Sequence, residues 1–176
     1  MLYLPRYAES EILRLITTNP AVVVVGPRQV GKTALVKHLF AQLPRQVAYF
    51  DLENPDDYNQ LNNPSLHLNL LKDHTVILDE VQRVPTLFPI LRSLIDQHRQ
   101  PGRFILLGSA SPELIRDSSE SLAGRVAYME LQPFSFRELP TTIDYRQHWL
   151  RGGFPDSILA GDDELSLDWR ENFIRS

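Results

Sequence analysis

Eight residues near the N-terminus combine two glycines, a lysine and a hydroxyl group at a fixed spacing. Residues 26–33 read Gly-Pro-Arg-Gln-Val-Gly-Lys-Thr and follow the wholly apolar run 21–25. Glycines let consecutive backbone N–H groups point into one concavity, and a helix that starts at about Gly31 adds its positive N-terminal end. Lys32 supplies a cation, and the Thr33 hydroxyl is a ligand for Mg²⁺. The pattern therefore predicts a site for the phosphates of a nucleoside triphosphate and its Mg²⁺ ion.

The alternative for this stretch is an ordinary glycine turn between a strand and a helix. Glycine makes up about 7% of protein residues, so a chance match in a chain of this length is of the order of one per cent. We therefore expect Lys32 to contact the β- and γ-phosphates and to contribute to catalysis. The predicted nucleotide-binding residues are Gly26, Pro27, Arg28, Gln29, Val30, Gly31, Lys32, Thr33 and Ala34.

A second chemical element is a pair of carboxylates at the end of an apolar stretch. Residues 75–80 read Thr-Val-Ile-Leu-Asp-Glu. A parallel strand here delivers Asp79 to the sheet edge where the run 21–25 also ends, and there it can hold Mg²⁺ through water. Glu80 is then placed to polarise a water that attacks the γ-phosphate. The alternative is a buried strand that ends in a solvated acidic turn, and the glycine-lysine pattern disfavours it.

Two further polar residues follow predicted elements. Ser109 comes directly after the apolar run 104–107 and a glycine, so it could orient the attacking water or sense the γ-phosphate. Capping the helix that follows Pro112 is an equal alternative. Arg125 follows Gly124, a residue type that often ends a helix. It could reach a phosphate in its own subunit or a neighbour's, and a surface salt bridge is the equal alternative. The five histidines show no ligand-like spacing.

Strand-like and helix-like stretches alternate through most of the chain, which predicts a parallel α/β sheet covered by helices on both faces. The expected strands are 21–25, 47–51, 75–79, 103–107 and 125–131. The expected helices are 9–18, 32–43, 87–98 and 112–123, with a polar loop at 53–64 and a short helix at 65–71 capped by Ser65. In the chain, the strand 47–51 lies between the two motif strands. This indicates the division of P-loop proteins in which an additional strand separates those two strands.

The alternation of strand-like and helix-like stretches ends after Pro133, where we expect a helical extension. Two short helices, a turn and a longer helix are expected at 134–139, 145–150, 151–155 and 163–176. The predicted organisation is a P-loop core over 1–133, followed over 134–176 by a helical extension or the start of a lid or linker. The last helix has no stop signal, so we expect the N-terminal part of a larger protein.

Composition restricts the class of protein. The chain has 176 residues, of which 43% are hydrophobic, and a formal net charge of −4. It can bury a core, and it lacks the overall basic character of non-specific nucleic-acid binders. The absence of cysteine excludes disulfides and thiolate metal sites. The longest aliphatic run is far shorter than the ~20 residues of a membrane helix, and the first residues do not form a signal peptide. We expect a cytoplasmic protein that does not engage a membrane.

Several segments occur in a fixed order: GPRQVGKT, VILDEVQRVPTLFPILRSLID, FILLGSAS, SLAGRV, LQPFSFREL and RGGFP. This set resembles the large prokaryotic family of AAA+-like ATPases in which an N-terminal P-loop domain precedes a second domain. The resemblance implies ATP rather than GTP, a Mg²⁺ role for Thr33 and Asp79, and a hydrolytic role for Glu80. Where this family often has threonine, the chain has Leu107, which leaves Ser109 as the hydroxyl for sensing.

Three function classes follow from these residues. The first is an ATPase switch that acts on an unknown protein or DNA partner, with a homo-oligomer among its possible assemblies. The second is a P-loop kinase of a small molecule or nucleotide, although the sequence shows no arginine-rich lid. The third is an ATP-gated binding module that does not hydrolyse ATP. For the adenine base, we expect a pocket formed by residues 2–7 and the helix 9–18.

Overall fold

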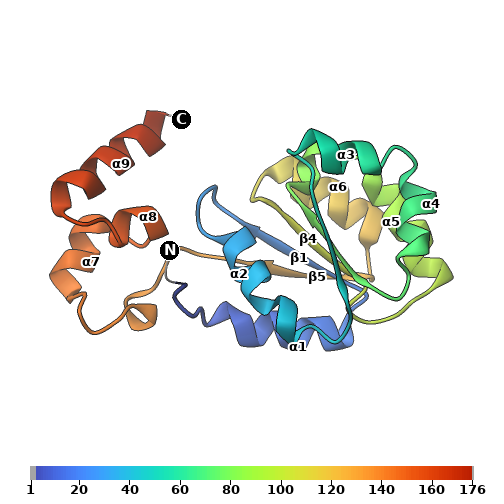
Figure 1. Ribbon diagram of the computed structural model, residues 1–176, viewed down its shortest axis with the longest axis horizontal. Coiled ribbons are helices and arrows are strands. Elements are labelled where there is room, and N and C mark those ends of the chain that lie inside the picture. Colours follow the sequence, from blue (N-terminus) through green and yellow to red (C-terminus); the bar gives the residue numbers. More distant parts are fainter. Residues whose placement is uncertain (1–2, 176) are drawn as a thin grey trace.

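The computed structural model describes residues 3–175, and for Pro112 and Glu113 it describes the backbone only. Five parallel strands form a single sheet between layers of helices (Figure 1). The strands are β1 Ala21–Gly26, β2 Val47–Asp51, β3 Thr75–Asp79, β4 Phe104–Ser109 and β5 Val126–Glu130. The predicted fold class is therefore confirmed. No helix within residues 3–175 combines the length and the apolar character that a bilayer-spanning helix requires.

The strand order is β2-β3-β4-β1-β5. An additional strand does separate β1 from β3, as the sequence predicts, but that strand is β4. The strand at 47–51, on which the prediction rested, lies at the edge of the sheet. Order along the chain does not determine order in a parallel sheet, because crossover helices carry the chain past neighbouring strands. Burial fits the observed positions, since β4 is almost entirely buried whereas β2 is mostly half-buried.

Both faces of the sheet are covered, which explains why β1 is a continuous apolar run. Val23 and Val25 pack in the core beneath α4, α5 and α6, which span Pro64–Leu70, Leu87–Gln97 and Pro112–Leu122. Val22 and Val24 point the other way and pack in the core beneath α1 (Ala8–Thr18) and α2 (Lys32–Leu39). Alternate side chains of a strand thus serve two cores, and this holds the end of β1 in a fixed place.

Two expectations in the region 53–71 are wrong in detail. The polar stretch forms a helix, α3 (Pro55–Gln60), where a loop was expected, and α4 begins at Pro64 with Asn63 as its cap instead of Ser65. Each helix starts with an Asn-Pro pair whose asparagine side chain accepts a backbone N–H of the first turn. Asparagine caps a helix well, and proline fits its first position because no N–H is needed there.

The segment 134–175, called here the helical extension, lies beyond one end of the sheet beside the N-terminal segment 3–7 (Figure 1). Its helices are α7 Tyr145–Arg151, α8 Pro155–Ile158 and α9 Asp163–Arg175, preceded by a 3₁₀ turn at Phe136–Glu138. The expected turn at 151–155 therefore leads directly into a short helix. Phe134, Ile143 and Ile158 form a small core of their own, joined by Leu4 from the N-terminal segment.

Candidate functional site

The turn after β1 explains why glycine occupies two of its positions. A Cβ on Gly26 would lie 2.5 Å from the carbonyl oxygen of Leu131, so a larger residue cannot fit. Gly31 caps α2 with φ of 97°, in the left-handed region that glycine adopts without strain. Gln29 also has a positive φ, of 60°. The loop therefore folds back over the start of α2, where backbone N–H groups meet the positive end of the helix.

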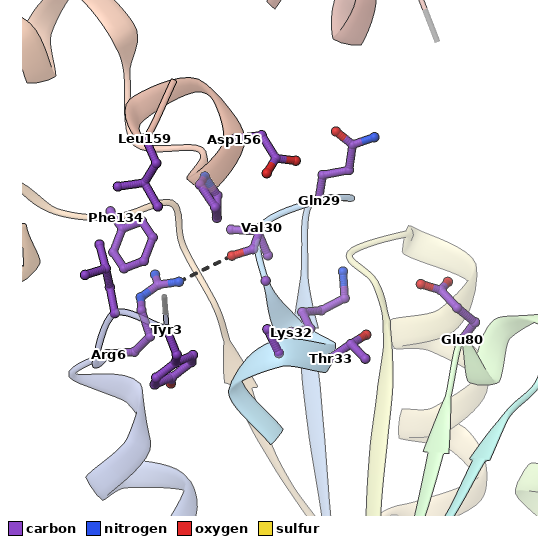
Figure 2. Close-up of a pocket in the computed structure, with 14 residues that line it drawn as sticks. Tyr3, Arg6, Gln29, Val30, Lys32, Thr33, Glu80, Phe134, Asp156 and Leu159 are labelled. Carbon is purple, nitrogen blue, oxygen red and sulfur yellow. Dashed lines mark hydrogen bonds between the residues drawn. The ribbon is translucent and has the colours of Figure 1, made fainter. Parts of the chain in front are cut away.

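Lys32 is buried and crosses the inside of this loop (Figure 2). Its Nζ donates hydrogen bonds to the carbonyl oxygens of Gly26, at 3.0 Å, and Pro27, at 2.8 Å. Burial lowers the pKa of Lys32, and the nearby Glu80 and Asp79 carboxylates oppose that shift. The ammonium group is thus held in the loop by neutral carbonyls, which phosphate oxygens could replace as stronger, charged partners.

The Asp79 carboxylate is buried and accepts hydrogen bonds from two hydroxyl groups. Its Oδ2 accepts from Thr33 Oγ1 at 2.6 Å and from the Tyr49 hydroxyl at 2.8 Å. Its Oδ1 accepts from the backbone N–H of Glu80 at 3.0 Å. Burial and the hydrogen bond to Asp79 raise the pKa of Tyr49, so the phenol remains a donor. Tyr49 is not among the residues predicted from sequence, because a tyrosine in a strand is most often a packing residue.

The oxygens of Thr33 and Asp79 fit a magnesium ion. Mg²⁺ takes oxygen ligands, keeps several waters and is usually held by one or two protein groups together with phosphates. Within residues 3–175, no group of three or more acidic, histidine or cysteine side chains could form an all-protein metal site. A Mg²⁺ ion held by Thr33 and Asp79 would complete its coordination with phosphate and water oxygens.

Glu80 lines the same cavity as Lys32 and Thr33. Its backbone is left-handed, with φ of 54° and ψ of 43°. A non-glycine residue adopts this conformation at a cost, and such strain often occurs at functional sites. Gln82 donates a hydrogen bond from Nε2 to Glu80 Oε2. The structure thus brings the predicted carboxylate, cation and hydroxyl together around one cavity.

Ser109 lies at the correct edge of the sheet, because its register partner in β1 is Gly26. It is half-buried at the end of β4 but is not among the residues that line the cavity. The alternative, that Ser109 caps the following helix, is wrong. That cap is Ser111, whose side chain accepts from the backbone N–H of Leu114 at 3.2 Å.

Arg125 lies away from the other predicted residues. It precedes β5 and so occupies the sheet edge opposite the end of β1. Its guanidinium forms two hydrogen bonds with Asp96, at 2.7 and 2.8 Å, and one with the carbonyl oxygen of Ala123, at 2.7 Å. The hydrogen bond from Arg125 lowers the pKa of Asp96. Of the two alternatives, the salt bridge is the one that the contacts support, and a phosphate contact within the same chain is excluded by position.

The cavity beside the P-loop has a volume of about 390 Å³. One wall comes from the N-terminal segment, one from the start of α2 and one from the helical extension (Figure 2). The residues that line it are Tyr3, Leu4, Arg6, Gln29, Val30, Gly31, Lys32, Thr33, Ala34, Glu80, Phe134, Pro155, Asp156 and Leu159.

Part of the segment expected to hold the base lines this cavity. Tyr3, Leu4 and Arg6 line the cavity, whereas α1 does not, and Leu2 falls outside the described residues. The four residues from the helical extension were missed, because only tertiary folding brings them to the P-loop. Pro155 of the Arg-Gly-Gly-Phe-Pro stretch comes within 3.8 Å of the position that a Cβ on Gly31 would take.

Arg6 joins all three walls. The buried guanidinium donates from Nη1 to the carbonyl oxygen of Val30 at 3.3 Å and from Nη2 to that of Gln132 at 2.5 Å. Its Nε lies 3.2 Å from Glu138 Oε1, and the group stacks 4.0 Å from the centre of the Phe134 ring. The N-terminal segment, the P-loop and the helical extension therefore share one buried cation.

Glu138 is the anionic partner of this cation. Besides Arg6, it accepts hydrogen bonds from the backbone N–H of Tyr7 and from both the backbone and the hydroxyl of Ser135, each at 2.9 Å. Burial alone would raise the pKa of Glu138, but these hydrogen bonds outweigh burial and lower it. The carboxylate is therefore held in its charged form.

Comparison with known proteins identifies one family, two proteins of similar sequence and solved structures of similar fold. Residues 18–140 match the model of a protein family described as an AAA domain. Two uncharacterized proteins, from Mycobacterium tuberculosis and Mycobacterium bovis, are each 42% identical over 174 residues, which is 99% of this chain. The chain spans 38% of the length of these two relatives.

Solved structures with the same fold include a Walker-type ATPase from Pyrococcus abyssi, with a TM-score of 0.68 and 17% identity. The similarity covers 98% of this chain and 72% of that one. The AMPPCP-bound DnaA from Aquifex aeolicus has a TM-score of 0.53 and 14% identity, over 94% of this chain and 63% of that one. At these identities the likeness establishes the fold and nothing further.

Proposed function

Because this chain belongs to the AAA family of P-loop NTPase domains, we propose that it binds Mg-ATP in the cavity beside the P-loop and hydrolyses it. One observation carries the proposal. The cavity is lined together by the loop backbone, the Lys32 ammonium, the Thr33 hydroxyl and the Glu80 carboxylate. A cation and N–H groups suit a polyphosphate, and a carboxylate beside them suits activation of water.

The residues then divide the work of hydrolysis. Lys32 exchanges its carbonyl partners for oxygens of the β- and γ-phosphates and balances their charge. Thr33 and Asp79 would hold Mg²⁺, which when bound neutralises phosphate charge and orients the phosphates. Glu80 accepts a proton from water while the water oxygen bonds to the γ-phosphorus. The bond from that phosphorus to the bridging oxygen breaks, and ADP and inorganic phosphate leave.

The base is proposed to lie between the N-terminal segment and the helical extension. Tyr3, Leu4, Phe134 and Leu159 offer the apolar part of the cavity, and adenine sites are largely apolar.

We take 1–133 as the core and 134–176 as a lid, because the extension has a small core of its own. A nucleotide that touches both parts would couple its binding and hydrolysis to their relative position, and so to contacts with a macromolecular partner.

Kinase activity is the weaker alternative. Arg6 is the one arginine among the cavity residues of the described chain, and it is already bonded to Val30, Gln132 and Glu138. It is therefore not free to follow a transferring phosphoryl group. The position of Glu80 also favours water over another acceptor.

The test is release of inorganic phosphate from Mg-ATP by the purified protein, with and without DNA and candidate small-molecule acceptors. We expect phosphate release that Lys32→Ala abolishes together with binding of an ATP analogue, while circular dichroism stays unchanged. Phosphate transferred to an acceptor would instead support the kinase. Binding without turnover under every condition would support the ATP-gated module. Unaltered analogue affinity in Lys32→Ala would exclude the nucleotide site itself.

A further inference from the structure

The side chain of Gln82 lies between Glu80 and the end of β4. Gln82 belongs to the 3₁₀ turn Val81–Arg83 that follows β3. Its Nε2 donates to Glu80 Oε2, and its Oε1 lies 2.6 Å from the position that a Cβ on Gly108 would take. One amide group is therefore in contact with the proposed catalytic carboxylate on one side and with a strand of the sheet on the other.

The sheet leaves room for this side chain. The register between β3 and β4 ends at the pair Leu78–Leu106, whereas β4 continues to Ser109 alongside β1. The last residues of β4 thus extend past the paired part of β3, and the Gln82 amide lies against them. Any side chain at Gly108 would collide with Gln82 Oε1 and, at 2.5 Å, with Leu114 Cδ2. The amide is therefore confined.

Because the Gln82 amide is confined, its Nε2–H group donates in one fixed direction. Its Oε1 is buried and has no hydrogen-bond partner within residues 3–175, so the amide is not held there by a bond of its own. A buried amide oxygen without a hydrogen-bond partner destabilises the fold. Such a group is retained where another interaction of the same side chain outweighs that loss. Here the other end of the amide meets a carboxylate whose backbone is itself held in the left-handed region.

We propose that Gln82 is the positioning residue for Glu80. This inference rests on the proposed hydrolysis. A glutamate side chain has three rotatable bonds, and a hydrogen bond to Oε2 fixes its carboxylate beside Lys32 and Thr33. It leaves Oε1 of Glu80 free to accept the proton of the attacking water. Gln82 itself does not line the cavity, so its effect on the reaction passes through Glu80.

The kinetic test uses Gln82→Met, which keeps the length of the side chain and removes the donor. We expect kcat to fall about 10- to 100-fold, the size expected for losing a hydrogen bond to a charged group. KM, affinity for an ATP analogue and Tm should stay unchanged, because the nucleotide does not contact Gln82. Gln97→Met on the exposed face of α5 is the matched control and should leave all four quantities unchanged.

A double-variant cycle tests whether Gln82 acts through Glu80. Once Glu80→Gln has removed the carboxylate, Gln82→Met should cost no further rate, because there is no base left to position. Equal fold losses in both backgrounds would overturn the proposal. So would a loss in Gln82→Met that appears in KM or Tm in place of kcat.

A spectroscopic measurement separates this inference from the proposed function. In ¹⁵N-labelled protein, the Gln82 side-chain amide signal is identified by its loss in Gln82→Met. Glu80→Gln should shift that signal, and Glu120→Gln, at an exposed position on α6, should not. If wild-type protein releases no phosphate, the proposed hydrolysis fails, and this shift alone then decides the Gln82–Glu80 contact. An amide signal that does not respond to Glu80→Gln would overturn the inference whether or not the protein hydrolyses ATP.

Discussion

Thr33 Oγ1 lies 2.6 Å from Asp79 Oδ2, although 46 positions separate the two residues in the chain. The contact links the start of α2 to the end of β3. In the sheet, β4 lies between β3 and β1, the strand that precedes α2. The hydrogen bond holds a hydroxyl oxygen and a carboxylate oxygen next to each other at this edge of the sheet. The proposed Mg²⁺ site therefore combines one hydroxyl oxygen with one carboxylate.

The first prediction concerns Tyr49, whose hydroxyl donates to the same oxygen, Asp79 Oδ2, as Thr33 does. We expect Tyr49→Phe to raise the Mg²⁺ concentration needed for tight binding of an ATP analogue by about 10-fold, the lower end of effects from such supporting residues. Titration calorimetry at several Mg²⁺ concentrations measures this. Tyr58→Phe, at an exposed position on α3, is the control. An identical Mg²⁺ dependence in Tyr49→Phe and wild type would show that Tyr49 only packs.

The second prediction is that Glu80→Gln keeps Mg-ATP binding and loses hydrolysis. The amide is nearly isosteric but cannot accept the proton of water, and removal of a general base costs roughly 10² or more in rate. Single-turnover phosphate release measures the chemical step, and analogue titration measures binding. Glu120→Gln should behave as wild type. Hydrolysis at the wild-type rate in Glu80→Gln would rule out the role given to this carboxylate.

The third prediction uses the lowered pKa of Glu138. Its folded-state pKa is below its ordinary value of 4.5, so the unfolded chain binds more protons in that range. The stabilisation by Glu138 is therefore fully present above pH 4.5 and is lost as the pH falls through the folded-state value. We expect Glu138→Gln to lower the free energy of unfolding by about 2 kcal/mol at neutral pH, because the buried Arg6 guanidinium loses its charged, half-buried partner.

Urea unfolding of wild type and Glu138→Gln, repeated in steps from neutral to acidic pH, checks this third expectation. The difference between the two proteins should shrink as the pH falls below 4.5. The exposed Glu120→Gln should show no such trend. A difference that stays constant across the range would mean that the charge of Glu138 contributes nothing to stability.

The fourth prediction is that Arg125→Ala leaves ATP hydrolysis unchanged at every protein concentration. Arg125 is engaged by Asp96 and Ala123 at the sheet edge opposite the P-loop. Loss of an exposed ion pair has only a small effect on stability. A rate loss confined to high protein concentration would reverse this expectation. If activity then returned on mixing Arg125→Ala with Glu80→Gln, Arg125 would act on a neighbouring subunit's nucleotide.

The sequence predicted the parts of the site that are local in the chain. The glycine turn, Lys32 and Thr33 form one continuous stretch, and Asp79 with Glu80 ends an apolar strand, so spacing alone was enough. Tyr49 and the four cavity residues of the helical extension were missed, because nothing near them in the chain resembles a site. Their roles depend on register and on the packing of the extension, which local patterns do not encode.

The same division applies to the fold. All five strands were predicted from apolar runs. The strand that separates β1 from β3 was predicted to be 47–51 but is β4, because crossover connections leave the order of parallel strands open. The start of α4 was assigned to Ser65, although Asn63 followed by Pro64 carries the stronger signal. The asparagine-proline pairs at 54–55 and 63–64 are local signals that mark where α3 and α4 begin.

Arg6, the buried cation that the three walls of the cavity share, bears on where this protein can be shortened. The family match covers residues 18–140, which hold every phosphate-binding residue proposed here. Tyr3, Leu4, Arg6, Pro155, Asp156 and Leu159 all lie outside that range. A shortened chain cut at the family boundaries would keep the residues of the phosphate cradle but lose most of the residues proposed for the base. It would also lose α1, which covers the core beneath Val22 and Val24. The boundaries of the family match are therefore not suitable limits for a shortened protein.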